Sequence, residues 1–354
     1  MKKSVVLFPL IAALLLCSCE NGKGSSGASL DALKTENSFV YGEGFFLPPV
    51  NDVYEYTCSF TAASENDLRE IVDIYFGEGE YARGVKIDLP DESGEFLPIM
   101  EWDNFAEEKQ AQLGKNGSFL VSDSSFYEAH GEGDWNSPSG IVFAPEFDRQ
   151  MISFPSGDIS VREAEAQAYQ ALLPIVRSIS PELDVRAVYA KKFKWHSDDT
   201  EYAEIFFSTV ADGQPTRCVL CDELDDIPAK NIMPDDPYGI CPFYIVSLFD
   251  DGKIQMAACT VWNGLIKDIK KGRRLEIKGL DDMLELLDKK AGSYAGHMTL
   301  EYAELEYTPT SRDGGQEVLS PFWAVYYRDD EDNCGVMYVN AQTGEIFKAP
   351  VYAD

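Results

Sequence analysis

The sequence predicts an α+β fold in which helices pack on antiparallel sheets, and three observations support this class. Apolar residues make up 45% of the 354 residues, which suits a folded chain. They recur at helical spacing in three separate segments and alternate with polar residues in many short segments. The order helix–strand–strand occurs after Ser160 and again after Gly279. This repeat predicts two related modules that follow a β-rich N-terminal segment.

The first eighteen residues have the pattern of an export signal. Lys2 and Lys3 precede an apolar run, Val5–Leu16. A run of this length is too short to span a bilayer, but it matches the apolar region of a signal peptide. We therefore predict that residues 1–18 are removed on export.

The end of this signal resembles the bacterial lipobox, because Leu16 stands three residues before Cys19 and the small Ser18 stands next to it. The resemblance implies cleavage before Cys19 and lipidation of that cysteine, so that the lipid attaches the protein to a membrane. A plain secretory signal with two incidental cysteines is the alternative. Residues 19–37 then form a flexible linker, since residues 20–29 read ENGKGSSGAS.

The charge is strongly negative, with 61 acidic and 30 basic side chains and a formal net charge of −31. Loss of Lys2 and Lys3 with the signal leaves 28 basic groups against 61 acidic ones, about −33. Phosphate binding needs clusters of Lys and Arg, so nucleic acid is excluded as a partner. The same charge argues against docking on anionic lipid through a basic patch.

Residues 38–157 are predicted to form the β-rich N-terminal domain. After a loop with two prolines, a strand is expected at Val53–Ala62. A helix follows, capped by Ser64 with Asp67 three residues on and ended by Gly77. A second helix is expected at Asn104–Leu113. The short strand candidates are Gly84–Leu89, Ser118–Val121 and Ile141–Phe143.

Residues 158–240 are predicted to form the first module. Ser160 and Glu163 make a capping box for a helix with an apolar stripe, which Pro174 should kink or end. Two strands, Asp184–Trp195 and Tyr202–Val210, should then pair across a polar turn.

Residues 241–354 are predicted to form a hairpin and the second module. The hairpin strands Phe243–Phe249 and Lys253–Trp262 flank an Asp-Asp-Gly turn. A helix should follow from Leu280, with acids in its first turn and lysines in its last. The later strands are expected at Met298–Tyr307, Phe322–Tyr327, Val336–Asn340 and Ile346–Ala349.

The C-terminal strands carry a resemblance to a known family. Residues 322–327 read FWAVYY and residues 335–346 read GVMYVNAQTGEI, which resembles the end of a PepSY domain, with Asn340 in place of the usual Asp. The start of the helix at 160–166, SVREAEA, resembles the opening of a PepSY helix. The chain is thus similar to bacterial lipoproteins with tandem PepSY-like or YycI-like modules. The resemblance implies extracytoplasmic inhibitory, regulatory or protein-binding modules without catalytic residues.

Six cysteines lie outside the signal. Cys218 and Cys221 form a CxxC pair, which is typical of a redox pair or half of a zinc site. Nearby acids would raise the pKa of a thiol, and no second CxxC stands at finger-like spacing. A structural disulfide or thiol pair is therefore favoured. Cys58 alternates with tyrosines, which predicts a buried thiol on a core-facing strand.

Searches for other chemistry predict no catalytic residue, metal or cofactor. His130, His196 and His297 are scattered, and no H-E-x-x-H, G-x-S-x-G or P-loop sequence occurs. The acidic run 330–335 begins like a calcium loop, but Cys334 stands where an oxygen ligand belongs.

The sequence therefore predicts a lipid-anchored, extracytoplasmic lipoprotein that is not an enzyme and binds or regulates another envelope protein, such as a peptidase or a sensor. An envelope hydrolase with an unrecognised carboxylate site is one alternative, and a solute- or glycan-binding lipoprotein is another. A hydrolase should show a deep pocket with converging carboxylates, whereas a glycan binder should show aromatic side chains along a groove.

Overall fold

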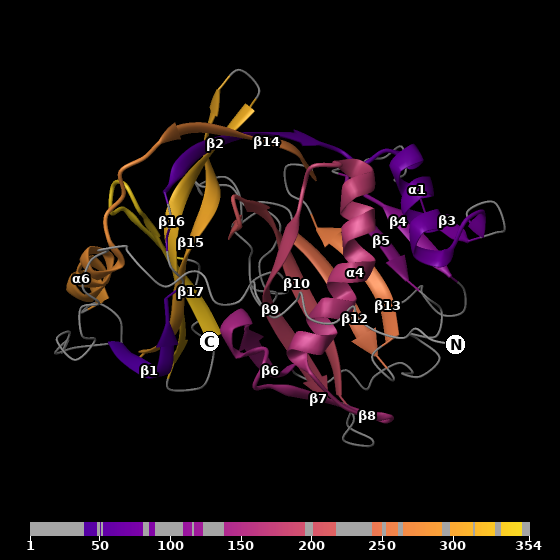
Figure 1. Cartoon of the computed structure of the whole chain (residues 1–354), viewed down its shortest axis with the longest axis horizontal. Helices are drawn as coiled ribbons and strands as arrows, with labels where there is room; N and C mark the ends of the chain where they lie inside the picture. Colours follow the sequence, from indigo (N-terminus) through magenta and orange to yellow (C-terminus); the bar gives the residue numbers. More distant parts are fainter. Residues whose placement is uncertain are drawn as a thin grey trace, which may run out of the picture. The chain divides into compact units, whose positions relative to one another are not determined.

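Two large β-sheets dominate the computed structural model (Figure 1). It describes residues 39–47, 50, 52–80, 85–88, 109–114, 117–122, 138–194, 201–216, 243–249, 253–260, 265–291, 298–313, 316–329 and 334–348. These residues form eighteen strands, three α-helices and one 3-10 helix, η3 (Ala144–Glu146). The predicted signal peptide, Cys19 and the linker lie outside them.

Sheet A has seven strands. Five of them follow one another in the order β1, β15, β16, β17 and β18, and β2 pairs with both β16 and β14. β1 runs parallel to β15, and the other pairs are antiparallel. The strands are β1 (Phe39–Phe46), β2 (Tyr54–Thr61), β14 (Leu265–Arg274), β15 (Met298–Asp313), β16 (Gln316–Asp329), β17 (Cys334–Asn340) and β18 (Ile346–Lys348).

Sheet B has nine strands in the order β3, β4, β5, β13, β12, β10, β9 and β6, with the short β11 paired to β10. Its strands are β3 (Lys86–Asp88), β4 (Gln110–Leu113), β5 (Phe119–Ser122), β6 (Pro138–Phe143), β9 (Val185–Lys194), β10 (Glu201–Ala211), β11 (Gln214–Pro215), β12 (Phe243–Phe249) and β13 (Lys253–Thr260). A small hairpin, β7 (Met151–Phe154) and β8 (Gly157–Ser160), precedes the longest helix.

The predicted α+β fold of two PepSY-like modules is wrong. Strand dominates the described residues, and each sheet collects strands from distant parts of the chain. β2, for example, pairs with β14 and β16, more than 200 residues later in the chain. The helix–strand–strand order is present locally, but in each case the two strands belong to a much larger sheet. Long-range strand pairing, which no local pattern encodes, decides the architecture.

The three helices begin near the positions that the sequence indicates. α1 (Glu65–Phe76) has the predicted capping box between Ser64 and Asp67, and its cap at the C-terminal end is Gly77. α4 (Val161–Ile179) has the box between Ser160 and Glu163. Pro174 lies inside α4 and does not end it, because the helix continues to Ile179. α6 (Leu280–Ala291) is the third helix, and no helix among the described residues is long and apolar enough to cross a membrane.

Two local predictions are wrong. A helix was expected at 104–113, but Gln110–Leu113 form the strand β4, which pairs with β5. The segment before Val53 was expected to be a loop, but Phe39–Phe46 form β1 along β15. Neither strand has a clear apolar alternation of its own, so each depends on its neighbour for its conformation.

An apolar layer packs the two sheets against each other. From sheet B, Phe143 and Tyr189 enter this layer, and from sheet A, Tyr302 and Tyr326 do so. Tyr302 and Tyr326 stack with ring centroids 4.3 Å apart, and Phe143 lies 5.1 Å from the Tyr326 ring. α1 and α4 contact each other and several strands of sheet B. These contacts hold the two sheets in the positions that create the site described below.

The turn after β17 explains the most distinctive part of the C-terminal motif. Asn340 accepts hydrogen bonds through Oδ1 from the backbone N–H groups of Gln342 and Thr343, both at 3.0 Å. Gly344 has a φ of +78°, in the left-handed region that favours glycine. The sequence NAQTG is therefore a tight turn that reverses the chain into β18.

Candidate functional site

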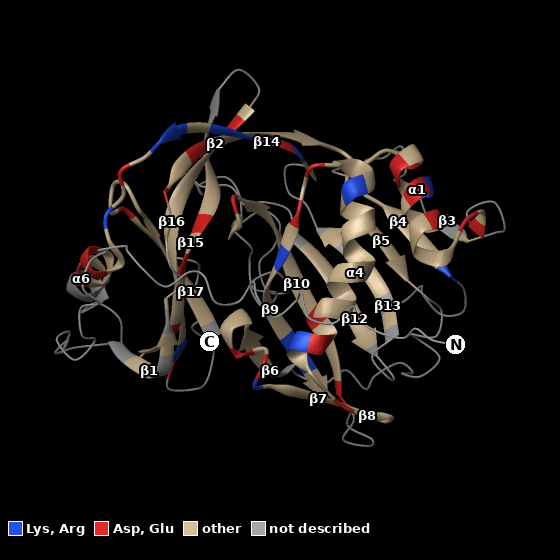
Figure 2. Ribbon diagram, in the orientation of Figure 1, with Lys and Arg blue, Asp and Glu red and all other residues tan. Residues whose placement is uncertain are grey.

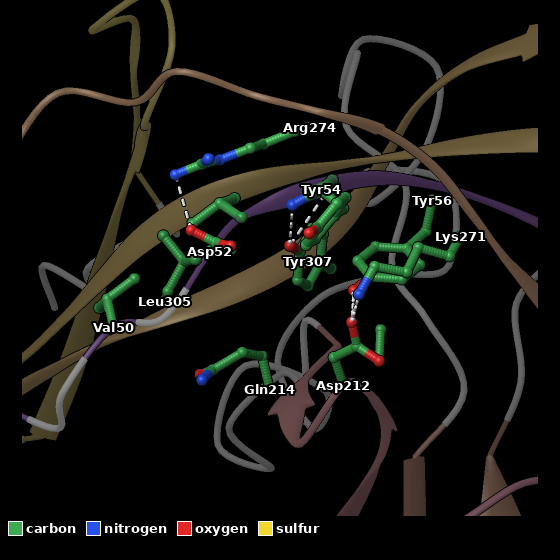
Figure 3. Close-up of a pocket in the computed structure, with 12 residues that line it drawn as sticks. Val50, Asp52, Tyr54, Tyr56, Asp212, Gln214, Lys271, Arg274, Leu305 and Tyr307 are labelled. Atoms are coloured by element: carbon green, nitrogen blue, oxygen red, sulfur yellow. Dashed lines mark hydrogen bonds and ion pairs between the residues drawn. The ribbon is translucent and has the colours of Figure 1, made fainter.

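A solvent-open groove of about 1020 Å³ lies where β2, β14 and β15 of sheet A approach the turn between β10 and β11 of sheet B (Figure 3). β2 supplies Tyr54 and Tyr56, β14 supplies Lys271 and Arg274, and β15 supplies Tyr307. Segments that are far apart in the sequence therefore build the groove, and the pairing of β2 with β14 and β16, together with that of β16 with β15, brings the sheet A segments together.

Buried tyrosines form one side of the groove. The rings of Tyr56 and Tyr307 pack edge to face with centroids 4.9 Å apart, and Tyr56 is only 3% exposed. The Tyr307 hydroxyl donates to the Tyr54 carbonyl at 2.9 Å. Burial raises the pKa of Tyr307 to about 12. Burial, and then the hydrogen bond to Asp212, also raises the pKa of Tyr56. Both hydroxyls are therefore protonated at neutral pH, and the tightly packed rings fix the positions of these donors.

Asp212 reaches the groove from the opposite side. It is at the tip of a two-residue turn, with φ of +49° at Asp212 and +80° at Gly213. Such a turn between paired strands needs positive φ at both positions, which Asp-Gly accommodates. Arg186 donates through Nη1 to the Gly213 carbonyl at 3.2 Å and so holds the turn. The turn places the Asp212 carboxylate beside β14.

Lys271 and Tyr56 converge on this carboxylate. The Lys271 Nζ is 2.6 Å from Oδ2 of Asp212, and the Tyr56 hydroxyl donates to the same oxygen (Figure 3). The Lys271 Nζ also lies 3.6 Å from the centre of the Tyr54 ring. The hydrogen bonds from Lys271 and then Tyr56 lower the pKa of Asp212, and the bond to Asp212 raises the pKa of Lys271. Both groups are therefore charged at neutral pH.

A second hollow of about 460 Å³ adjoins the first. The two share Tyr56, Asp212 and Lys271, so the Lys271–Asp212 ion pair lies at their boundary. Lys267 and Ser180 line the far end, where the Ser180 hydroxyl donates to the Lys267 carbonyl. We call the two hollows together the β14 groove, because β14 runs along both.

β14 is basic although the chain as a whole is acidic (Figure 2). Its ten residues include five cations and one acid, Asp268. Arg274 lies 2.6 Å from Asp52, Arg273 lies 3.3 Å from Glu55, and Lys270 lies 3.5 Å from Asp268. These pairs are exposed, and exposed pairs contribute only about 0–1 kcal/mol each. Water or a competing anion therefore reaches the cations easily.

A buried acidic cluster lies between the sheets, behind the groove. Glu304 is 2% exposed and forms an ion pair with Arg186, while Glu306 is 0% exposed and accepts a hydrogen bond from Tyr326. Burial, and then the nearby charge of Glu304, raises the pKa of Glu306 to about 8. An ion-paired acid beside one that is neutral at pH 7 resembles the acid–base pair of a hydrolase. Their burial, however, keeps any substrate away from both in this conformation.

The residues predicted from the sequence are not the ones that form the groove. Cys19, Cys218, Cys221 and the three histidines lie outside the described residues. The burial predicted for Cys58 is confirmed, since it is 0% exposed. Among the described residues, no group of three or more His, Cys, Asp or Glu side chains is placed to hold a metal ion. The signals that could have indicated the groove were the Asp-Gly turn at 212–213 and the basic run at 267–274.

No family model matches the chain, and no curated protein matches it. Among solved structures, the chain is similar to an uncharacterized protein from Eubacterium rectale ATCC 33656, with 14% sequence identity and a TM-score of 0.48. That match covers 91% of this chain and 95% of the other.

Proposed function

We propose that the chain is a lipid-anchored, extracytoplasmic binding protein without enzymatic activity, and that the β14 groove is its ligand site. The observation that carries this proposal is the groove itself. Its larger hollow, at about 1020 Å³, is at the upper end of the range for ligand pockets, and it combines aromatic rings with a few fixed polar groups. The membrane attachment rests on the signal and the lipobox-like sequence before Cys19.

The electrostatics of the groove favour binding over catalysis. A general acid or base works best when its pKa lies near the operating pH. In the groove, the pKa of Asp212 is lowered, and the pKa values of Lys271, Tyr56 and Tyr307 are raised. These shifts stabilise the protonation states that the groups already have at neutral pH. The groove therefore offers steady donors and charges, which suit recognition of a ligand.

Site-specific crosslinking in intact cells tests the groove. A photocrosslinking residue in place of Gln214, which lines the larger hollow, should capture a ligand from the protein's own envelope. The same residue in place of Met151, which is exposed on β7 and does not line either hollow, is the control. A large mass increase that occurs only with Gln214 identifies a protein partner, and a small increase identifies a solute or a glycan fragment. Identical adducts at both positions, or none at Gln214, would overturn the proposal.

Two further measurements test the rest of the proposal. Cys19→Ala should move the protein from the membrane fraction to the soluble fraction, and unchanged membrane retention would refute lipidation of Cys19. Purified protein should leave a panel of peptides and glycans intact. Turnover of any of them that is lost in Glu306→Gln would favour an envelope hydrolase.

A further inference from the structure

We infer that the β14 groove recognises a carboxylate of an acidic peptide segment, and that Asp212 now holds the position this carboxylate takes. The inference rests on the proposed ligand site and names its ligand class. Its starting point is that Lys271 Nζ and the Tyr56 hydroxyl donate to one and the same oxygen of Asp212. Two donors that converge on one carboxylate oxygen, one of them charged, form an anion-binding site.

The Tyr56 donor is fixed by burial and the Lys271 donor by its contact with a ring, while the Asp212 carboxylate is exchangeable. Tyr56 is 3% exposed and packs on Tyr307, and the Lys271 ammonium lies against the Tyr54 ring. The Lys271 and Asp212 side chains are 47% and 52% exposed, and Asp212 is carried by a two-residue turn. Rotation about its own side-chain bonds removes Asp212 from the donors without disturbing either sheet. A carboxylate from another chain then meets the same two donors.

Additional cations continue the site along β14. Lys267 lines the smaller hollow and Arg274 lines the larger one, on either side of Lys271. At about 3.3 Å per residue, the seven steps from Lys267 to Arg274 span roughly 23 Å. The groove therefore matches an extended ligand with several acidic groups.

Two observations favour a peptide over another polyanion. The group that now fills the anion site is an aspartate at the end of a β-strand, so the geometry already fits a polypeptide carboxylate. Within the described part of the chain β14 pairs only with β2, and an extended peptide backbone is the kind of ligand that adds to the other edge of such a strand. An edge rich in lysine also prevents aggregation, but this role alone does not require the convergent donors on Asp212.

Fluorescence anisotropy with a labelled hexaglutamate peptide at low ionic strength tests the inference. Lys271→Gln should weaken binding about fivefold, because it removes the central cation of the site and an exposed ion pair is worth up to about 1 kcal/mol. The matched control is Lys270→Gln, which makes the same charge change on the same strand, although Lys270 lines neither hollow. It should weaken binding less than threefold. Equal losses in the two variants would show non-specific attraction to β14 and would overturn the inference.

Asp212→Asn tests the competition directly. Because an exposed ion pair is worth up to about 1 kcal/mol, removal of the resident carboxylate should tighten peptide binding up to about fivefold. Asp158→Asn, which removes one exposed charge on β8, is the control for net charge. Equal affinities in these two variants, or no peptide binding by wild type and Asp212→Asn alike, would overturn the inference. Thermal melting of each variant shows whether it is folded.

A further arm separates the possible ligand classes. A sulfated polysaccharide that binds in a Lys271-dependent way, while hexaglutamate does not bind, would overturn the peptide as ligand. That result would leave the β14 groove as a ligand site and would refute only the acidic peptide as its ligand. Capture of a neutral partner from Gln214 would have the same consequence, so the two proposals fail in distinguishable ways.

Discussion

Replacement of Glu306 by Gln should abolish most of the pH dependence of stability between pH 5 and pH 8. Burial and the charge of Glu304 raise the pKa of Glu306 to about 8 in the folded protein, against an ordinary value of 4.5. The folded state therefore holds a proton that the unfolded state loses as the pH rises through 4.5. Wild-type stability should fall as the pH rises from about 4.5 to about 8 and should level off above that.

The size of the effect follows from the same numbers. One pKa unit corresponds to about 1.4 kcal/mol, so three pH units between pH 5 and pH 8 give a change on the order of 4 kcal/mol. Glutamine has nearly the shape of the neutral acid, and its carbonyl can still accept the hydrogen bond from Tyr326. Glu306→Gln should therefore match wild type near pH 5 and be more stable than wild type at pH 8.

Urea unfolding at pH 5, 6, 7 and 8 measures this difference through the midpoint at constant m-value. Glu276→Gln, an exposed change of the same kind before α6, is the control and should leave the wild-type pH dependence intact. Parallel pH profiles for wild type and Glu306→Gln would mean that Glu306 titrates as an exposed acid. That result would refute the argument from burial.

Three other changes give separate tests of the fold. Glu304→Gln leaves Arg186 without its ion-pair partner. Thermal unfolding at pH 7 should therefore show a loss of about 2 kcal/mol in the free energy of unfolding. An unchanged stability would mean that the pair is not formed. Gly117→Ala should strongly lower the free energy of unfolding, since a Cβ there would lie 2.4 Å from the Ala63 backbone nitrogen. A Cβ at Gly157 meets no atom within 4 Å, so Gly157→Ala should cost only about 1 kcal/mol of left-handed strain. Equal losses in the two glycine variants would contradict the packing of Gly117. Ser160→Ala removes the cap of α4 and should cost about 1 kcal/mol in urea unfolding, while Ser178→Ala, near the other end of α4, serves as the comparison.

The sequence predicts well those features that depend on neighbouring residues. The capping boxes at Ser64 and Ser160 and the hairpin of β12 and β13 need only short-range contacts, and the structure contains all of them. The two-module fold failed because the partners of β2 and β5 lie far along the chain. β14 has no alternation of apolar and polar residues, since most of its side chains face solvent. The groove could not be predicted for the same reason, because it exists only where β14, β2 and the Asp212 turn meet.

The inter-sheet acids and the groove are physically connected through Arg186. One end of its guanidinium, Nη2, pairs with Glu304 between the sheets, and Nη1 donates to the carbonyl of Gly213 in the turn that carries Asp212. Arg186, the cation that pairs with the buried Glu304 carboxylate, therefore also fixes the position of the turn relative to β14. Loss of the Glu304 charge releases Arg186 from one of its two anchors and so loosens the turn. Since Asp212 reaches Lys271 only from this turn, the position of the anion site is set by a contact between the sheets as well as by residues within the groove.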